Sequence, residues 1–259
     1  MRTSVVVVAL LLLAAAPASA DKGKLADFDA AFTTGAASTA SGLKVNVHLH
    51  RENDADAKPS PLRSAVIHLP FGTEIDTTAV PQCKATDEEL KLRGSDACPP
   101  ETELTVGSFS AMTGFGPPVD PLAGDDHVFN GPNQLIEVIT VPGLPVSPAF
   151  DRVMIDGTTL TAHPPVAPGG PPEGETSVRS IDFSMPVRGG YVTTPAMCTD
   201  TWTASATFGF ADGSSDTVKS ASACENNMPI MPPARVHHCR KHAHHGRKHH
   251  GRKRCGRRR

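Results

Sequence analysis

The sequence predicts an all-β protein, organised as a single antiparallel β-sandwich with one short helix; immunoglobulin-like layers are one form that fits. Three observations lead to this class. Residues 201–210 alternate between apolar and polar side chains with the period of two that is typical of a half-buried strand. The 24 prolines and 22 glycines among 259 residues favour many short turns over long helices. Nine or ten short strands separated by turns then favour one packed domain.

The alternating segment predicts the first strand of a hairpin. Its apolar face consists of Trp202, Ala204, Ala206, Phe208 and Phe210. Asp212-Gly213 has the composition of a tight two-residue turn. Cys198 and Cys224 flank the unit, so we expect a disulfide between them, with two free buried thiols as the alternative. In the register of a two-residue loop they are not direct partners. A disulfide then requires a bulge, or a return strand that leaves the ladder before Cys224.

The first twenty residues have the three parts of a secretory signal peptide. Arg2 lies before an apolar run at residues 5–16, and Ala18-Ser19-Ala20 fits a cleavage site. We therefore expect a secreted protein, and no later apolar run reaches the ~20 residues of a membrane-spanning helix. The expected organisation is a signal peptide at 1–20, a linker or edge strand at 21–42, the β-sandwich at 43–230 and a disordered tail at 231–259.

Other segments between the leader and the hairpin have β-strand patterns. Leu43 to Leu49 alternates regularly, and Gln134 to Val141 is strongly apolar. The strands expected before the hairpin cover residues 43–49, 64–69, 104–112, 134–141, 150–155, 158–162, 178–186 and 190–194. A second hairpin turn is expected at Asp156-Gly157. Residues 113–126 and 163–174 are rich in glycine and proline, which predicts loops.

One short helix is expected between Cys83 and Cys98. Thr86 and Glu89 match a helix capping box, and Gly94 is suited to end the helix. Because a short helix returns the chain toward its start, we expect Cys83 to form a disulfide with Cys98. Closing a loop of this size contributes ~3 kcal/mol of stability in the chain-entropy model.

Charge is divided unequally along the chain. Residues 21–234 carry 13 Lys and Arg against 27 Asp and Glu, a net charge of −14. Residues 235–259 carry 11 Lys and Arg, 7 His and no acidic residue. A basic tail without apolar periodicity is expected to be disordered and to bind polyanions by releasing their counterions. The expected polyanion-binding residues are Arg240, Lys241, Arg247, Lys248, Arg252, Lys253 and Arg254.

The tail has three other interpretations. Its histidine pairs flank Cys239 and suit chelation of a transition metal. The tail is also long enough to fold back on the acidic body. Its tandem HHGRK repeat is compatible, as a third alternative, with an inert expansion. Cys239 and Cys255 are candidates for a third disulfide that closes the repeat into a ring. The expected partners are anionic cell-wall polymers, polysaccharides or lipid headgroups, without specific nucleic-acid recognition.

Histidines and acidic residues in the body offer weaker candidate sites. Histidines 48, 50 and 68 suit a zinc or copper site, but a solvated polar strand face is favoured. The acidic positions considered are Asp54, Asp56, Asp125, Asp126, Asp212 and Asp216. They lack the spacing of a calcium loop and are interpreted as solvated turn residues. Because a Gly-x-Ser-x-Gly motif is absent, we expect no catalytic residue. We also expect no metal site in the body and no cofactor.

Several short motifs carry a family resemblance. They are LPFGT at 69–73, VPQC at 80–83, ACP at 97–99, FNG at 129–131, TPAMC at 194–198, Asp212-Gly213 and Cys224. In order and in cysteine placement, they resemble an uncharacterised family of secreted proteins from high-GC Gram-positive bacteria. The resemblance covers about residues 43–224. It implies an exported, disulfide-bearing β domain and brings no known activity, ligand or catalytic residue.

Together these observations predict a non-catalytic secreted protein with a β-sandwich body and a tail that binds anionic extracellular polymers. The main alternative is a ligand-binding or adhesion module whose ligand contacts the loops at 113–126 and 163–174. A secreted hydrolase built from scattered residues is the third hypothesis.

Overall fold

The computed structural model describes residues 24–143 and 149–225, in which one large antiparallel sheet dominates. Across this sheet, the strands follow the order β1 (Ala26–Phe32), β3 (Leu43–Leu49), β11 (Ser177–Met185), β6 (Glu103–Met112), β7 (Leu122–Gly131), β8 (Gln134–Thr140), β9 (Ala149–Asp156), β10 (Thr159–Ala162), β4 (Leu62–His68), β13 (Thr201–Phe210) and β14 (Ser215–Ala223). None of the described helices is long and apolar enough to span a membrane.

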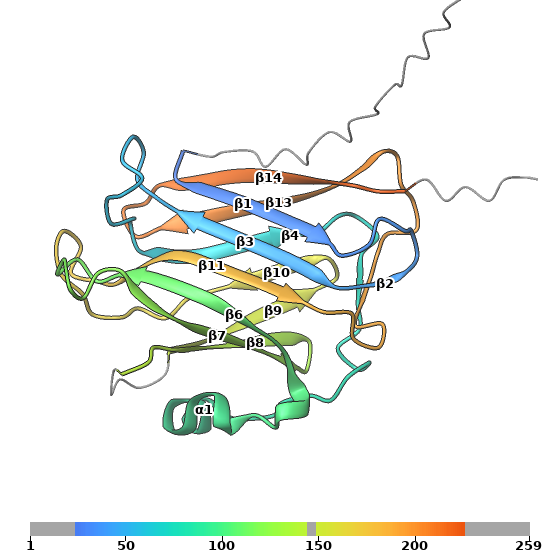
Figure 1. Ribbon diagram of the computed structural model, residues 1–259, viewed down its shortest axis with the longest axis horizontal. Helices are drawn as coiled ribbons and strands as arrows, with labels where there is room; N and C mark the ends of the chain where they lie inside the picture. Colours follow the sequence, from blue (N-terminus) through green and yellow to red (C-terminus); the bar gives the residue numbers. More distant parts are fainter. Residues whose placement is uncertain (1–23, 144–148, 226–259) are drawn as a thin grey trace, which may run out of the picture. The chain divides into compact units, whose positions relative to one another are not determined.

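The single sheet does not confirm the expected β-sandwich. A sandwich has two separate sheets that face each other. Here hydrogen bonds connect all eleven strands in one series, and the sheet rolls until its edge strands β1 and β14 lie side by side (Figure 1). The coarser expectations are confirmed: the described chain is mostly β, the large sheet is antiparallel, and one short α-helix is present.

Between β1 and β14, side chains rather than a backbone ladder join the two edges of the sheet. Beyond the strand ends, Glu225 donates its N–H to the Gly35 carbonyl at 2.7 Å. Eleven strands that alternate in direction leave the two edge strands, β1 and β14, parallel to each other. The antiparallel ladder therefore cannot continue across the line where they meet, which we call the seam. The Asp216 carboxylate on β14 instead accepts the backbone N–H of Leu25 at 2.7 Å. Ser220 accepts the N–H of Ala30 at 3.1 Å and donates to Asp29 at 2.7 Å. These contacts give hydrogen-bond partners to N–H groups in and just before the edge strand β1, which would otherwise lack them.

The inner face of the roll forms the main hydrophobic core. The predicted alternation of the hairpin strand is confirmed, because each of its apolar residues from Trp202 to Phe210 is buried. The other strands contribute Phe28, Val45, Val47, Leu62, Leu104, Val128, Leu135, Val153, Leu160, Phe183 and Val218. A small sheet of β2 (Ala40–Ser41), β12 (Val192–Thr193) and β5 (Glu74–Ile75) lies at one end of the roll (Figure 1).

The predicted helix and its disulfide are confirmed. Helix α1 (Asp87–Arg93) begins with the capping box of Thr86 and Glu89, and two 3₁₀ turns follow it at Gly94–Ala97 and Pro100–Thr102. Leu90 and the Cys83–Cys98 disulfide pack on the outer face of β7 and β8. These strands are therefore buried on both faces, which explains the nearly continuous apolar run of β8.

The hairpin loop has three residues instead of two. Gly209 pairs with Ser215, Phe210 donates its N–H to the Ser214 carbonyl, and only Gly213 has a positive φ, +82°. The Cys198–Cys224 disulfide nevertheless forms. A bulge or an early departure of the return strand was the expected requirement. In the structure, Cys198 precedes the ladder, which begins at Thr201.

Strand β7 is the largest error in the predicted elements. The loop predicted over residues 113–126 is shorter in the structure, because β7 begins at Leu122. This strand pairs with β6 over Leu122–Phe129 and with β8 over Asp125–Gly131. Polar residues at 124–127 conceal this strand from a search for alternating hydrophobicity. Asp126 therefore belongs to the interior of a sheet rather than to a turn.

The loops at 50–61, 113–121, 163–176 and 211–214 meet at one end of the roll, which we call the loop end (Figure 1, left). Gly170 donates its N–H to the Thr113 carbonyl at 2.6 Å. A Cβ at Gly114 would lie only 2.4 Å from the Pro171 carbonyl oxygen, so this close approach requires glycine. The two loops that the sequence analysis nominated for binding are thus in contact.

Candidate functional site

Three carboxyl groups lie on the inner face of adjacent strands. Asp126 is on β7, Glu137 on β8 and Asp151 on β9. Glu137 and Asp151 are direct cross-strand partners, and Glu137 also faces Val128, two residues from Asp126. Because alternate residues of a strand point to the same face, the three side chains form one cluster, which we call the acid cluster.

The acid cluster has little compensation for its burial. Asp126 is fully buried, and neither of its carboxyl oxygens has a hydrogen-bond partner. Asp151 accepts the N–H of Arg152 at Oδ1, 2.7 Å away, but its Oδ2 is buried without a partner. Within residues 24–143 and 149–225, no ion pair joins the cluster to a basic side chain. An ionised carboxylate in such a place loses its hydration without an equivalent gain.

Burial raises the pKa of all three groups. At Asp126, loss of hydration raises the pKa to about 7, although the charge of His127 acts in the opposite direction. At Glu137, loss of hydration and then repulsion from Asp126 and Asp151 raise the pKa well above its usual value. Burial also raises the pKa of Asp151, against the effect of hydrogen bonds from the backbone. Part of the cluster is therefore protonated at neutral pH.

Two small cavities border the acid cluster. The inner cavity, about 90 Å³, is lined by Glu137 and Asp151 together with apolar side chains such as Phe109 and Ile139. The core cavity, about 70 Å³, is lined by Glu137 and by apolar residues of β3, β4, β10, β11 and β13. Glu137 therefore lies on the wall that these cavities share.

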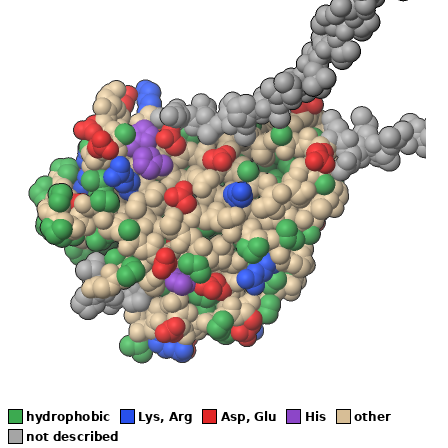
Figure 2. All heavy atoms as spheres, in the orientation of Figure 1, with side chains coloured by type: hydrophobic (Ala, Val, Ile, Leu, Met, Phe, Trp, Pro, Cys, Tyr) green, Lys and Arg blue, Asp and Glu red, His purple; other side chains and the backbone are tan. Residues whose placement is uncertain are grey.

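A larger apolar cavity of about 610 Å³, which we call the mouth, lies at the loop end. The mouth and the inner cavity share the lining residues Phe109, Ala111, Ile139, Ala149, Ala167 and Thr176. Phe115 and Val119 line the mouth and remain 67% and 41% exposed. Apolar side chains gather at this end of the molecule in Figure 2 (green, left). A largely apolar passage thus leads from the loop end to the acid cluster.

Two polar networks hold the loops around the mouth. Asp120 accepts hydrogen bonds from the backbone N–H groups of Thr113, Gly114 and Gly116, at 2.6 to 2.9 Å. Burial alone would raise the pKa of Asp120, but these bonds and one from the Thr113 hydroxyl lower it below its usual value. Such bonds fix the loop in one conformation.

The second network centres on a buried lysine. Lys58 donates to the Gly170 carbonyl at 3.0 Å, and its ammonium group lies 3.4 Å from Glu173. Arg51 also pairs with Glu173. The loop at 163–176 is thereby tied to the loop at 50–61.

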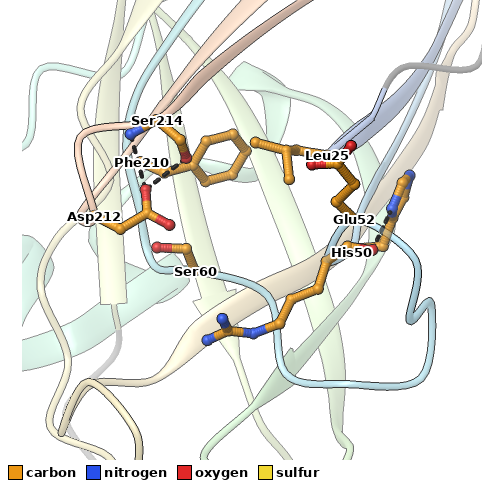
Figure 3. Close-up of a pocket in the computed structure, with 8 residues that line it drawn as sticks. Leu25, His50, Glu52, Ser60, Phe210, Asp212 and Ser214 are labelled. Atoms are coloured by element: carbon orange, nitrogen blue, oxygen red, sulfur yellow. Dashed lines mark hydrogen bonds between the residues drawn. The ribbon is translucent and has the colours of Figure 1, made fainter.

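A separate surface pocket of about 300 Å³ contains two serines, Ser60 and Ser214, together with a histidine and an aspartate (Figure 3). Ser60, His50 and Asp212 are the three side chains to compare with a catalytic triad. Ser60 and Asp212 face each other, whereas the imidazole of His50 lies on the far side and bonds the Arg51 carbonyl at 3.2 Å. Asp212 accepts the N–H and the hydroxyl of Ser214, which lower its pKa. The three side chains do not form the hydrogen-bonded relay that serine nucleophiles use.

The histidines considered for a metal site are not brought together. The rings of His48, on β3, and His50, just after it, are 6.0 Å apart. His68 lies on β4, which is not adjacent to β3, and bonds Thr159 at 3.0 Å. In the described part of the chain, no group of three His, Cys, Asp or Glu side chains is arranged to hold a metal ion.

The acidic residues interpreted as solvated turn residues behave differently from one another. Asp54 and Asp212 accept local backbone N–H groups in turns, as expected. Asp126 is buried inside the sheet, and Asp216 forms part of the seam, so the prediction was wrong for both. Local composition cannot show whether strand pairing turns a polar residue toward the interior.

Two of the three expected disulfides, Cys83–Cys98 and Cys198–Cys224, are present. Cys239 and Cys255 lie outside the described residues. The same is true of the expected polyanion-binding residues Arg240, Lys241, Arg247, Lys248, Arg252, Lys253 and Arg254, and of the signal peptide.

The acid cluster was not among the sites predicted from the sequence. The available signal was Glu137, a single acidic residue in the apolar run QLIEVITV, at a position that shares a strand face with Leu135 and Ile139. An acid on the buried face of a strand needs a partner or an explanation.

No protein-family model, curated protein or solved structure matches the chain.

Proposed function

We propose that residues 24–225 form a non-catalytic exported binding module that holds a small apolar molecule inside the rolled sheet. The apolar passage from the mouth to the inner cavity is the observation that carries this proposal. Ligand sites in proteins are typically concave, mainly apolar, and equipped with a few polar groups that orient the ligand. The mouth and inner cavity have this composition, with the acid cluster at the far end.

The ordered rim supports the same function. Asp120 and Lys58 fix the loops around the mouth before any ligand arrives. A pre-formed site loses less conformational entropy on binding than a site that must be ordered. The two disulfides fit an oxidising compartment outside the cytoplasm, in agreement with the expected leader.

A neutral fluorescent probe, N-phenyl-1-naphthylamine, tests the binding function. We expect saturable fluorescence enhancement with the wild-type protein. Ala167→Phe, which fills the junction between the mouth and the inner cavity, should weaken binding about tenfold or more because it removes ligand volume. Ala123→Phe adds the same ring on the exposed outer face of β7 and serves as the control. Equal binding by both variants, or no binding by the wild type, would refute the proposal.

The charge of the C-terminal segment favours a second function, attachment to anionic extracellular polymers. Residues 235–259 carry 11 basic residues and no acidic residue. The full chain should be retained on immobilised heparin and released by salt, because counterion release drives such binding. A chain that ends at residue 234 should pass through unretained. Equal retention of the two chains would eliminate the tail as the binding segment.

A further inference from the structure

The acid cluster gives the proposed binding site a chemical preference. Glu137 and Asp151 line the inner cavity, and the Oδ2 atom of Asp151 is buried without a hydrogen-bond partner. Asp126, on the next strand, is fully buried and has two carboxyl oxygens without partners. Carboxyl oxygens without hydrogen-bond donors are therefore concentrated at the inner end of the apolar passage that begins at the mouth.

Few charged groups act on this cluster from the surrounding protein. The charge of His127 opposes the raised pKa of Asp126, and the Nδ1 atom of His127 lies 2.7 Å from the Glu103 carboxylate. The backbone and the charge of His163 likewise oppose the raised pKa of Asp151. The strands that face Glu137 across the core cavity contribute apolar side chains, among them Val45, Val47, Ile67, Phe183 and Phe208. The described residues thus supply no ammonium or guanidinium group to the cluster.

We propose that this site, which rests on the function proposed above, binds a primary amine or similar small organic cation, with its ammonium group against Glu137 and Asp151 and its apolar part in the mouth. An ammonium group has three hydrogen-bond donors and one positive charge, which match the unpaired carboxyl oxygens. A carboxylate ligand would meet like charges, and a hydroxyl ligand would leave the charge uncompensated.

The size of the cavities fits this arrangement. The inner cavity, at about 90 Å³, suits an ammonium group and a few methylene groups. The mouth, at about 610 Å³, accommodates a larger apolar part. Entry with the charged end first places the cation beside Glu137 and leaves hydrocarbon against Phe109 and Ile139.

Binding of a cation requires ionised carboxyl groups, so it is linked to proton release. The groups that determine this linkage are Glu137, Asp126, Asp151, His127 and His163. Alkylammonium ions stay protonated well above neutral pH. Amine affinity should therefore increase from pH 5 to pH 8, while the affinity of a neutral ligand of equal length stays constant.

Three ligands with six carbon atoms each test the inference: hexylamine, hexanol and hexanoate, each titrated by displacement of N-phenyl-1-naphthylamine at pH 5 and pH 8. At pH 8 we expect hexylamine to bind about tenfold more tightly than hexanol, because its ammonium group forms one charge-assisted contact that hexanol cannot form. Hexanoate should bind most weakly. Glu137→Gln should abolish the amine preference, so that hexylamine and hexanol bind with equal affinity. Glu74→Gln, at an exposed glutamate of β5, is the control.

The outcomes separate the two proposals. Equal binding of hexylamine and hexanol, or an unchanged amine preference in Glu137→Gln, would overturn the amine assignment while the cavity remains a binding site. Failure of the probe and of all three ligands to bind would overturn both proposals. Amine affinity that is independent of pH while Glu137→Gln weakens it would also contradict the predicted proton release.

Discussion

Asp125 and Asp126 show how strongly one position in a strand decides the behaviour of a side chain. The two aspartates are neighbours in β7, but Asp125 points outward and is exposed, whereas Asp126 points inward and is fully buried. Sequence composition treats them alike, and the sequence analysis placed both in a solvated loop. Only the pairing of β7 with β6 and β8 determines which of them faces the interior.

This difference predicts how stability depends on pH. The pKa of Asp126 is about 7 in the folded protein, against 3.8 for an unperturbed group. Ionisation is then easier in the unfolded chain, so this group lowers stability progressively as pH rises from about 4 to about 7. Removing it should change the stability difference between pH 4 and pH 7.5 by on the order of 3 kcal/mol, since each pKa unit corresponds to about 1.4 kcal/mol.

Urea unfolding of Asp126→Asn at the two pH values measures this effect. Relative to the wild type, the variant should gain stability as pH rises. Asp125→Asn removes the same formal charge from the outer face and corrects for the general repulsion of an acidic protein. If the two variants respond to pH in the same way, Asp126 is solvated in the folded state.

At the scale of the element, the sequence predicted best those segments whose signal is local. The capping box fixed the start of α1, and the alternation in Leu43–Leu49 and in 201–210 gave β3 and β13. The hairpin loop was predicted less well, because Asp212-Gly213 fits a two-residue turn and a three-residue loop equally. Strand β7 was missed because its polar side chains face both the solvent and the acid cluster.

The seam between β1 and β14 yields a prediction for hydrogen exchange. Asp216→Ala should speed exchange of the Leu25 and Ala26 amides by about 10- to 150-fold, since one hydrogen bond to a charged group is worth roughly 1.5–3 kcal/mol. Ser220→Ala should speed exchange at Ala30 by a smaller factor, about fivefold, because a bond to a neutral hydroxyl is worth about 1 kcal/mol. Lys219→Ala, at an exposed position between them, is the matched control. Unchanged protection at all three amides would show that the seam does not depend on these side chains.

For the whole molecule, the sequence predicted the all-β fold class but not the rolling of one sheet until its edge strands meet. Turn frequency and alternation indicate many antiparallel strands, but they do not specify which strands become edges or how far a sheet rolls. A sandwich and a rolled sheet bury the same alternating residues. The difference matters for function, because rolling places the acid cluster of β7, β8 and β9 around cavities rather than on an open face.

The most direct test of this account is a pH titration of the side-chain carboxyl carbons by ¹³C NMR, with assignments for Asp126, Glu137 and Asp151. An enclosed cluster predicts a midpoint near pH 7 for Asp126 and midpoints above the ordinary values for Glu137 and Asp151. Titration of all three groups near pH 4, as in solvated carboxyl groups, would mean that water reaches them freely and that the sheet does not enclose the proposed site.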